Sequence, residues 1–229
     1  MRVKNTVDDL TKFTILSHLT DEGLERVKKQ LFQRTYKKNQ LLFTVGDPRE
    51  RIYLLSKGYV KLEKTNADAT MLYLDYVKPH DLFPYGGMFK DTYYHYAAYA
   101  LTDIMVYYIP TTIFEELVQT NKEQLLYIVN RLSRILEQHE RRLQTVTTSN
   151  VKDKVEQSIT YLLEGFGIPK ENDVVIDVPM TITEIAKISG TSRETVSHVF
   201  KDLRCDGLLT MEGRQIIIHD VNYFKDKVQ

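Results

Sequence analysis

The segment Thr181–Leu203, TITEIAKISGTSRETVSHVFKDL, constrains the fold of this chain more than any other. Its central glycine predicts a turn between two short helices. Thr181 with Glu184, and Thr191 with Glu194, each match the T-x-x-E capping box that opens a helix. The segment therefore predicts a helix-turn-helix.

The second of these helices has an apolar side and a polar side. The apolar side repeats at the i, i+3, i+4, i+7 spacing of a buried stripe, with Val196, Val199, Phe200 and Leu203. Arginine can bind O6 and N7 of guanine, and glutamate can accept from N4 of cytosine. We interpret this as a DNA-reading helix; the alternative is a helical hairpin with a solvated face. The candidate DNA-binding residues are Thr181, Thr191, Ser192, Arg193, Glu194, Ser197, His198 and Lys201.

Composition narrows the class of protein. The 229 residues suffice for two domains, and 31 basic residues balance 31 acidic ones, so any positive surface must be local. No apolar run is long enough for a membrane span, and MRVKNTVDDLTKF lacks the apolar core of a signal peptide. We expect a soluble, cytoplasmic protein with no membrane partner. The one cysteine, Cys205, excludes an internal disulfide framework.

The first half of the chain has a β texture. After a capped helix near Thr20–Phe32, short apolar or alternating runs fill Lys38–Ile109, separated by turn signals such as Gly46-Asp47-Pro48. Many short strands at this spacing predict a rolled antiparallel unit.

A helical period returns at Thr112 and runs to about Thr147. Its apolar positions follow a 4-3-4-3 spacing typical of a helix that pairs with another helix. The seam residues are Leu125, Val129, Leu132, Leu136, His139, Leu143 and Val146. The pattern favours a homodimer; the alternative is a helix that lies on its own β domain.

The last part of the chain reads as a small helical domain with a hairpin. Asn150 caps a helix that runs through Glu164, so we expect a hinge around Thr147–Asn150. A loop, GFGIPKEND, and a short strand, VVIDV, precede the helix-turn-helix. LLTM then pairs with RQIIIHD across Glu212-Gly213, as in the wing of a winged helix.

This order of elements resembles the catabolite-activator/fumarate-nitrate-regulator (Crp/Fnr) family over nearly the whole chain. The strongest motifs are ITEIAKISGTSRETVSHVFKDL, the SKGYVKLE hairpin and the turn at Phe43–Pro48. The resemblance implies an α+β fold: an antiparallel β-roll sensor domain at 1–111, a dimerisation helix and hinge at 112–149, and a winged helix-turn-helix at 150–229. It also implies a homodimeric transcription factor that binds a palindrome in double-stranded DNA, with RNA polymerase as a partner if it activates.

The resemblance extends to the base-reading positions. Arg193 and Glu194 resemble the catabolite-activator pattern, and Ser197 resembles the fumarate-nitrate pattern. His198 stands where both usually have arginine. We expect an operator with TGTGA-like half-sites.

The effector motifs of the family are changed. Cyclic-nucleotide members carry a Gly-Glu pair for the ribose and an Arg-Ser pair for the phosphate; here Pro84 and Tyr85, then Tyr94 and His95, stand at or near these positions. Burying a phosphate without a cation is costly. We therefore expect no cyclic AMP.

No other cofactor is expected. We expect no iron–sulfur cluster, because the sequence has no N-terminal group of cysteines to ligate one. Haem would need axial ligands. His80 and His95 are the two candidates, and we interpret both as structural or exposed residues.

Tyrosines dominate the expected sensor. In one interpretation they form a pocket for an uncharged or peptide-like effector, loosely similar to the PrfA group of Listeria virulence regulators. In the other they fill the roll, and the protein is competent without a ligand. The candidate effector residues are Tyr85, Tyr94, Tyr96 and His139. His139 could instead fix the register of the helix pair.

Nothing in the chain indicates an enzyme: nucleophile-elbow, Walker, dinucleotide and HExxH motifs are all missing. A β-roll sensor that works mainly through protein partners remains the alternative to a DNA-binding regulator.

Overall fold

The computed structural model describes residues 7–65, 72–147 and 150–225. The chain divides into two compact units, Met1–Ile135 and Leu136–Gln229. The boundary falls inside one long helix, so each unit is described by itself.

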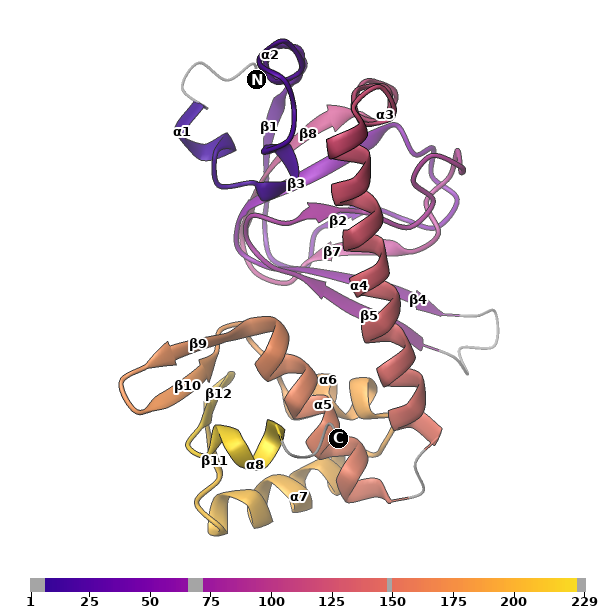
Figure 1. Ribbon diagram of the computed structural model, residues 1–229. Coiled ribbons are helices and arrows are strands. Elements are labelled where there is room, and N and C mark those ends of the chain that lie inside the picture. The colour runs from indigo at the N-terminus through magenta and orange to yellow at the C-terminus, as the bar shows by residue number, and fades with distance from the viewer. Residues whose placement is uncertain (1–6, 66–71, 148–149, 226–229) are drawn as a thin grey trace. The chain divides into compact units, whose positions relative to one another are not determined.

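The first unit combines short helices with two antiparallel sheets of four strands (Figure 1). Its helices are α1 (Val7–Leu10), the 3-10 turn η1 (Thr14–Leu16), α2 (Asp21–Lys29), α3 (Thr111–Gln119) and the start of α4 (Lys122–Thr147). One sheet has the order β1 (Phe32–Tyr36), β8 (Ile104–Pro110), β3 (Arg51–Lys57) and β6 (Leu82–Phe83). The other has the order β2 (Leu41–Phe43), β7 (Ala97–Ala100), β4 (Val60–Thr65) and β5 (Leu72–Val77).

These two sheets confirm the predicted β-roll. The roll begins one strand earlier than predicted. The capped helix was expected to reach Phe32, but α2 ends at Lys29 and Phe32 opens β1, which pairs with β8. Thr20 does cap α2, since its hydroxyl accepts from the amide of Gly23. In FQRTY the two ends are at least partly buried and Arg34 and Thr35 are exposed, and the segment is held as a strand by its ladder to β8.

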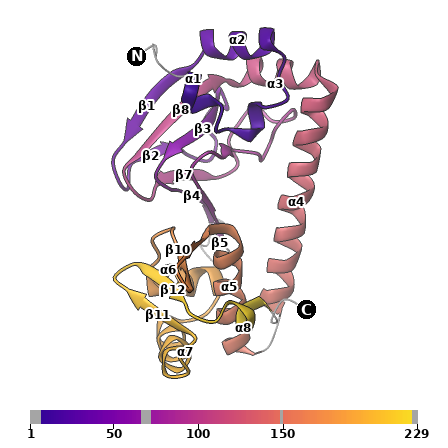
Figure 2. The ribbon, with the colours of Figure 1, turned by 60° about the vertical axis from the view of Figure 1, so that its left-hand side comes forward.

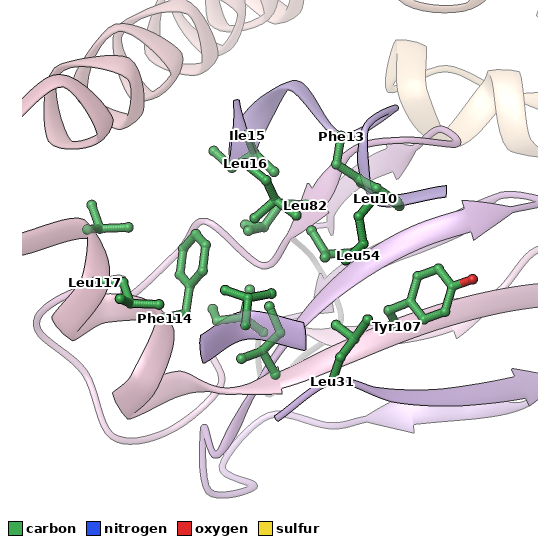
Figure 3. Close-up of a cluster of buried hydrophobic side chains, with 14 of the residues drawn as sticks. Leu10, Phe13, Ile15, Leu16, Leu31, Leu54, Leu82, Tyr107, Phe114 and Leu117 are labelled. Carbon is green, nitrogen blue, oxygen red and sulfur yellow. The ribbon is translucent and has the colours of Figure 1, made fainter. Parts of the chain in front are cut away.

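Two apolar clusters hold the first unit together. One joins the N-terminal helices to the outer side of the roll through Phe13, Leu54, Tyr107 and Phe114 (Figure 3). The other fills the inside of the roll with aromatic rings and small residues, among them Phe43, Tyr53, Phe83, Tyr94, Tyr96 and Ala98. Each cluster joins elements from distant parts of the sequence, helices as well as strands in the first, which is why the unit closes as one body.

The predicted helix from Thr112 to Thr147 is wrong in one respect, because it is two helices. α3 ends at Gln119, where the Thr120 hydroxyl donates back to the carbonyl of Glu116 at 2.9 Å. The Asn121 side chain then accepts from the amide of Gln124 at 3.1 Å and starts α4. A threonine-asparagine pair provides both a stop and a new cap, which the apolar spacing alone cannot reveal.

The apolar positions of α4 point in two directions. Leu125 and Leu132 pack against the core of the first unit. Val129, Leu136 and Leu143 are 48%, 59% and 67% exposed. They recur every seven residues, so one heptad position of the predicted seam faces out, whereas Leu125 and Leu132 of the other position face the roll. The side chain of Val146 lies outside the described residues.

The second unit is a helix-turn-helix flanked by a four-stranded antiparallel sheet. Its helices are α5 (Val151–Phe166), α6 (Ile182–Ser189), α7 (Arg193–Cys205) and α8 (Val221–Lys225). The sheet order is β11 (Leu209–Glu212), β12 (Gln215–Ile218), β10 (Asp173–Ile176) and β9 (Gly167–Lys170). The hairpin β11–β12 is the predicted wing.

Asn150 caps α5 as expected, with its side chain accepting from the Lys152 amide at 3.0 Å. The expected hinge includes residues 148 and 149, which lie outside the described part of the chain. The predicted loop GFGIPKEND is wrong, because Gly167–Lys170 forms β9 and pairs with β10. Its glycine and proline read as loop signals, yet they occupy an edge strand, where proline is tolerated.

Candidate nucleic-acid interface

The first helix of the motif is fixed at both ends by its own sequence. Thr181 accepts from the Glu184 amide at 3.1 Å, and Glu184 accepts from the Thr181 amide at 2.8 Å, so the predicted first capping box is confirmed. Gly190 ends α6 with a φ of +61°, a left-handed conformation that favours glycine.

The predicted second capping box is wrong by one residue. Ser192, and not Thr191, caps α7, and its hydroxyl accepts from the Thr195 amide at 3.1 Å. Thr191 still belongs to the end of α6, because its amide donates to the Ala186 carbonyl at 3.0 Å. Because Thr191 is part of the turn that follows Gly190, α7 is capped by the next residue with a hydroxyl group, Ser192.

Along α7 the polar side of the predicted reading helix is open to solvent. Val196, Val199, Phe200 and Leu203 are buried, as predicted from their spacing. In both views α7 lies along the edge of the second unit, with β11 packed beside it (Figures 1 and 2). The exposed side chains of the predicted set on α7 and at its cap are Ser192, Arg193, Glu194, Ser197, His198 and Lys201.

Glu194 is poised as an anion at the N-terminus of α7. Hydrogen bonds from its own backbone amide and from the Ser192 hydroxyl lower the pKa of this carboxyl. It is therefore ionised at neutral pH and can accept hydrogen bonds, as a cytosine amino group would require.

Three of the eight predicted residues serve local structure, among them Ser192, which caps α7. Thr181 is half-buried in its capping box, and the Thr191 hydroxyl lies 2.9 Å from that of Ser189. Sequence reasoning also missed Arg204, an exposed cation one turn after Lys201. The i, i+3 spacing from Lys201 was the available signal. Cys205, the last residue of α7, is exposed as well.

The predicted effector residues do not form one group. Tyr94 and Tyr96 belong to the cluster inside the roll, Tyr85 packs against the other cluster, and His139 lies in the second unit. The Tyr94 ring stacks on Phe43 with centroids 3.9 Å apart, and its hydroxyl donates to the Arg51 carbonyl at 2.9 Å.

Tyr96 and Tyr85 are also held by groups of the chain itself. The Tyr96 hydroxyl accepts from the Gly86 amide at 3.3 Å. Tyr85 lies beneath Arg131 of α4, whose guanidinium carbon is 5.8 Å from the ring centroid. Burial raises the pKa of both phenols to about 12, so both are neutral donors at physiological pH.

The segment between Tyr85 and His95 has further internal ties. Glu115 of α3 accepts from the Phe89 amide at 2.9 Å and from buried Arg49 at 2.5 Å. His95 lies 2.8 Å from the carboxylate of Asp91. The described residues contain no cluster of histidine, cysteine and acidic side chains that could hold a metal, and no described helix is long and apolar enough to cross a membrane.

Both units match known protein families. Residues 33–121 match the cyclic nucleotide-binding domain model, and residues 156–226 match the Crp-like helix-turn-helix domain model. The chain is 30% identical to the HTH-type transcriptional regulator ArcR of Staphylococcus epidermidis, over 83% of each chain. It is 26% identical to the global nitrogen regulator of Nostoc sp., over 81% of this chain and 84% of that one.

Solved structures show the same fold at lower identity. FixK2 from Bradyrhizobium japonicum aligns over 86% of this chain and 96% of that one, with a TM-score of 0.73 and 19% identity. A CooA mutant from Carboxydothermus hydrogenoformans aligns over 92% and 98%, with a TM-score of 0.70 and 19% identity.

Fold, interface and relatives together define a class, the DNA-binding transcriptional regulators with a β-roll, a long helix and a winged helix-turn-helix. The chain belongs to the Crp/Fnr family of this class. Its relatives are regulators and not enzymes, as the absence of catalytic motifs predicted.

Proposed function

We propose that the protein acts as a homodimer that binds a palindromic operator through α7. The observation that carries this proposal is the exposed polar side of α7, with Arg193 and Glu194 in its first turn and an apolar stripe behind it. The N-terminal turn of such a helix enters the major groove, where arginine and glutamate distinguish G·C pairs. As a bacterial DNA-binding protein it would work in the cytoplasm, and with RNA polymerase if it activates.

The outward side of α4 supports the homodimer. Val129, Leu136 and Leu143 form an exposed apolar row at heptad spacing, with Leu126 beside it and 52% exposed. A second copy of the same row would remove these side chains from water and is the simplest two-fold partner. The partner contacts would therefore involve half of the predicted seam, while Leu125 and Leu132 hold α4 to the roll.

We also propose that DNA binding needs no cyclic nucleotide. Tyr85 stands where the family's ribose carboxylate is expected, and Tyr94, beside the phosphate-binding position, is buried in the core. The exposed candidate, His95, is 2.8 Å from Asp91, whose negative charge would oppose a phosphate. The hydroxyls of Tyr94 and Tyr96 already hydrogen-bond to backbone groups of the roll, and Tyr85 hydrogen-bonds to Arg131 of α4, which supports a sensor filled by its own rings.

Fluorescence anisotropy with labelled DNA tests both parts. A duplex with two TGTGA-like half-sites about one helical turn apart should bind more tightly than a scrambled duplex of equal composition. Cyclic AMP should leave both affinities unchanged. Equal affinity for the two duplexes would contradict sequence-specific reading, and tighter operator binding with cyclic AMP would contradict ligand independence.

The other candidate, a sensor that acts mainly through protein partners, has no observation of its own in its favour. The same experiment separates the two, because such a sensor would bind neither duplex at physiological salt.

A further inference from the structure

The second unit contains a hollow of about 220 Å³ between α7, the wing and the start of α6. At about 30 Å³ for each water, this volume is that of roughly seven water molecules. It suits a small molecule rather than a protein segment.

The inner surface of the hollow is apolar. Phe200 and Leu209 are buried beneath it, and half-buried Ile182 and Met211 complete the wall from α6 and β11. Aliphatic and aromatic surface of this kind favours a hydrocarbon group over water.

The rim, in contrast, is positively charged. Lys201 and Arg204 line the hollow from successive turns of α7, and both are exposed. Neither makes an ion pair with any residue that the structure describes. Two cations beside an apolar wall complement a ligand with an anionic head and an apolar body.

We propose that this hollow binds a small carboxylate with an apolar tail of about seven carbons, with the carboxylate toward Lys201 and Arg204 and the tail toward Phe200 and Met211. An inorganic phosphate would satisfy the rim but leave the apolar wall in water. A neutral hydrocarbon would satisfy the wall but leave the charges unused.

Such a ligand would oppose DNA binding, and this consequence rests on the proposed function. Ser197 and Lys201 line the hollow and belong to the candidate DNA-binding set. A carboxylate beside Lys201 would neutralise a charge that DNA needs and would repel nearby phosphates. By linkage, the ligand weakens operator binding by the same factor by which the operator weakens ligand binding.

Methyl NMR on the full chain without DNA tests the site directly. The chain has six methionines, and a Met211→Leu variant assigns the Met211 signal. Octanoate should shift this signal saturably and leave that of Met180, a buried residue of the same unit, in place. Octylammonium, with a tail one carbon longer and the opposite charge, should bind far more weakly, and inorganic phosphate should leave the signal unchanged.

One variant and its matched control check the role of the rim. Arg204→Gln should weaken octanoate binding about fivefold, because an exposed charge pair contributes modestly. Lys170→Gln, at an exposed cation on β9, is the matched control and should leave it unchanged. No saturable shift with octanoate, an equal response to octylammonium, or the same shift with inorganic phosphate would each overturn the proposal.

A final measurement links the site to DNA. Octanoate should raise the dissociation constant of the operator complex in the unmodified protein and less so in Arg204→Gln. If the protein binds no operator at all, the proposed function fails while the NMR result still decides the site. If octanoate binds but operator affinity stays constant, the antagonism is wrong.

Discussion

The guanidinium of Arg131 in α4 lies 3.3 Å from the carboxylate of Asp81, just before β6. The same side chain covers the partly buried ring of Tyr85 and hydrogen-bonds to its hydroxyl. Burial raises the pKa of Asp81, and a carboxyl in such a place needs a cation nearby to stay ionised. The first half of α4 is therefore tied to the roll at the position where the family's effector carboxylate is expected.

Replacing Arg131 should loosen that tie. Arg131→Met keeps much of the aliphatic stem but leaves Asp81 without its cation, so we expect a loss of about 1–2 kcal/mol of stability, reduced by partial exposure of both groups. Urea unfolding measures this loss. Arg134→Met, at an exposed arginine on the same helix, is the matched control. Equal effects of the two substitutions would show that the pair contributes nothing specific.

The two sides of α4 should respond differently to charge. Leu136→Glu places a carboxylate on the exposed row, so it should give monomers that remain folded, and operator affinity should fall with dimerisation. Leu132→Glu buries a charge against the chain's own core and should lower the unfolding temperature as well. Sedimentation and thermal unfolding separate these outcomes. A wild-type protein that is monomeric at micromolar concentration would contradict the assignment of the exposed row of α4 to a dimer interface.

Arg193 should act on specific DNA more than on random DNA. Losing a bidentate contact to guanine costs on the order of 1–3 kcal/mol, so Arg193→Ala should flatten discrimination at one G·C pair of each half-site. Lys170→Ala removes a cation of the same unit from an exposed edge strand and serves as the control. Equal losses on operator and scrambled DNA would mark Arg193 as a phosphate contact.

The first unit should lose stability in alkali. Burial raises the pKa of Tyr96 to about 12, while an unfolded tyrosine titrates near 10. Below pH 10 both states hold the proton and the full stability is present. As the pH rises from about 10 to 12 the unfolded chain loses its proton first, and at 1.36 kcal/mol per pKa unit roughly 3 kcal/mol is lost.

Urea midpoints measured across this pH range test that expectation. Tyr107, which donates to Asp9 at 2.8 Å and also has a pKa of about 12, should contribute in the same direction. Tyr96→Phe should therefore make the decline shallower without removing it. A decline of unchanged slope in Tyr96→Phe would exclude Tyr96 as a cause.

Local signals in the sequence were enough for the helix-turn-helix. The Thr181 box, the glycine turn and the apolar stripe of α7 each depend on residues within one or two helical turns, so their spacing predicts them. The second cap was missed because two hydroxyl residues compete for one position, and only the fold of the turn decides between them.

Contacts between distant segments were beyond the same reasoning. A 3.5-residue repeat in α4 indicates an apolar seam but does not say which partner covers each position. Arg131 and Asp81 lie on different elements and carry no shared pattern. Tyr94 and Tyr96 precede β7, and their hydrogen bonds to backbone groups depend on how the sheets close.

The chain's one sulfhydryl, Cys205, ends α7 in contact with solvent, so it offers a natural attachment point for a probe. A maleimide fluorophore placed there needs no substitution and would report the approach of DNA to the reading helix. In a homodimer each copy of Cys205 would carry one spin label, and the separation of the two labels would record the distance between the two reading helices. The width of that distance distribution, with and without operator, would show whether the DNA-free protein has one arrangement of the reading helices or several, of which DNA selects one.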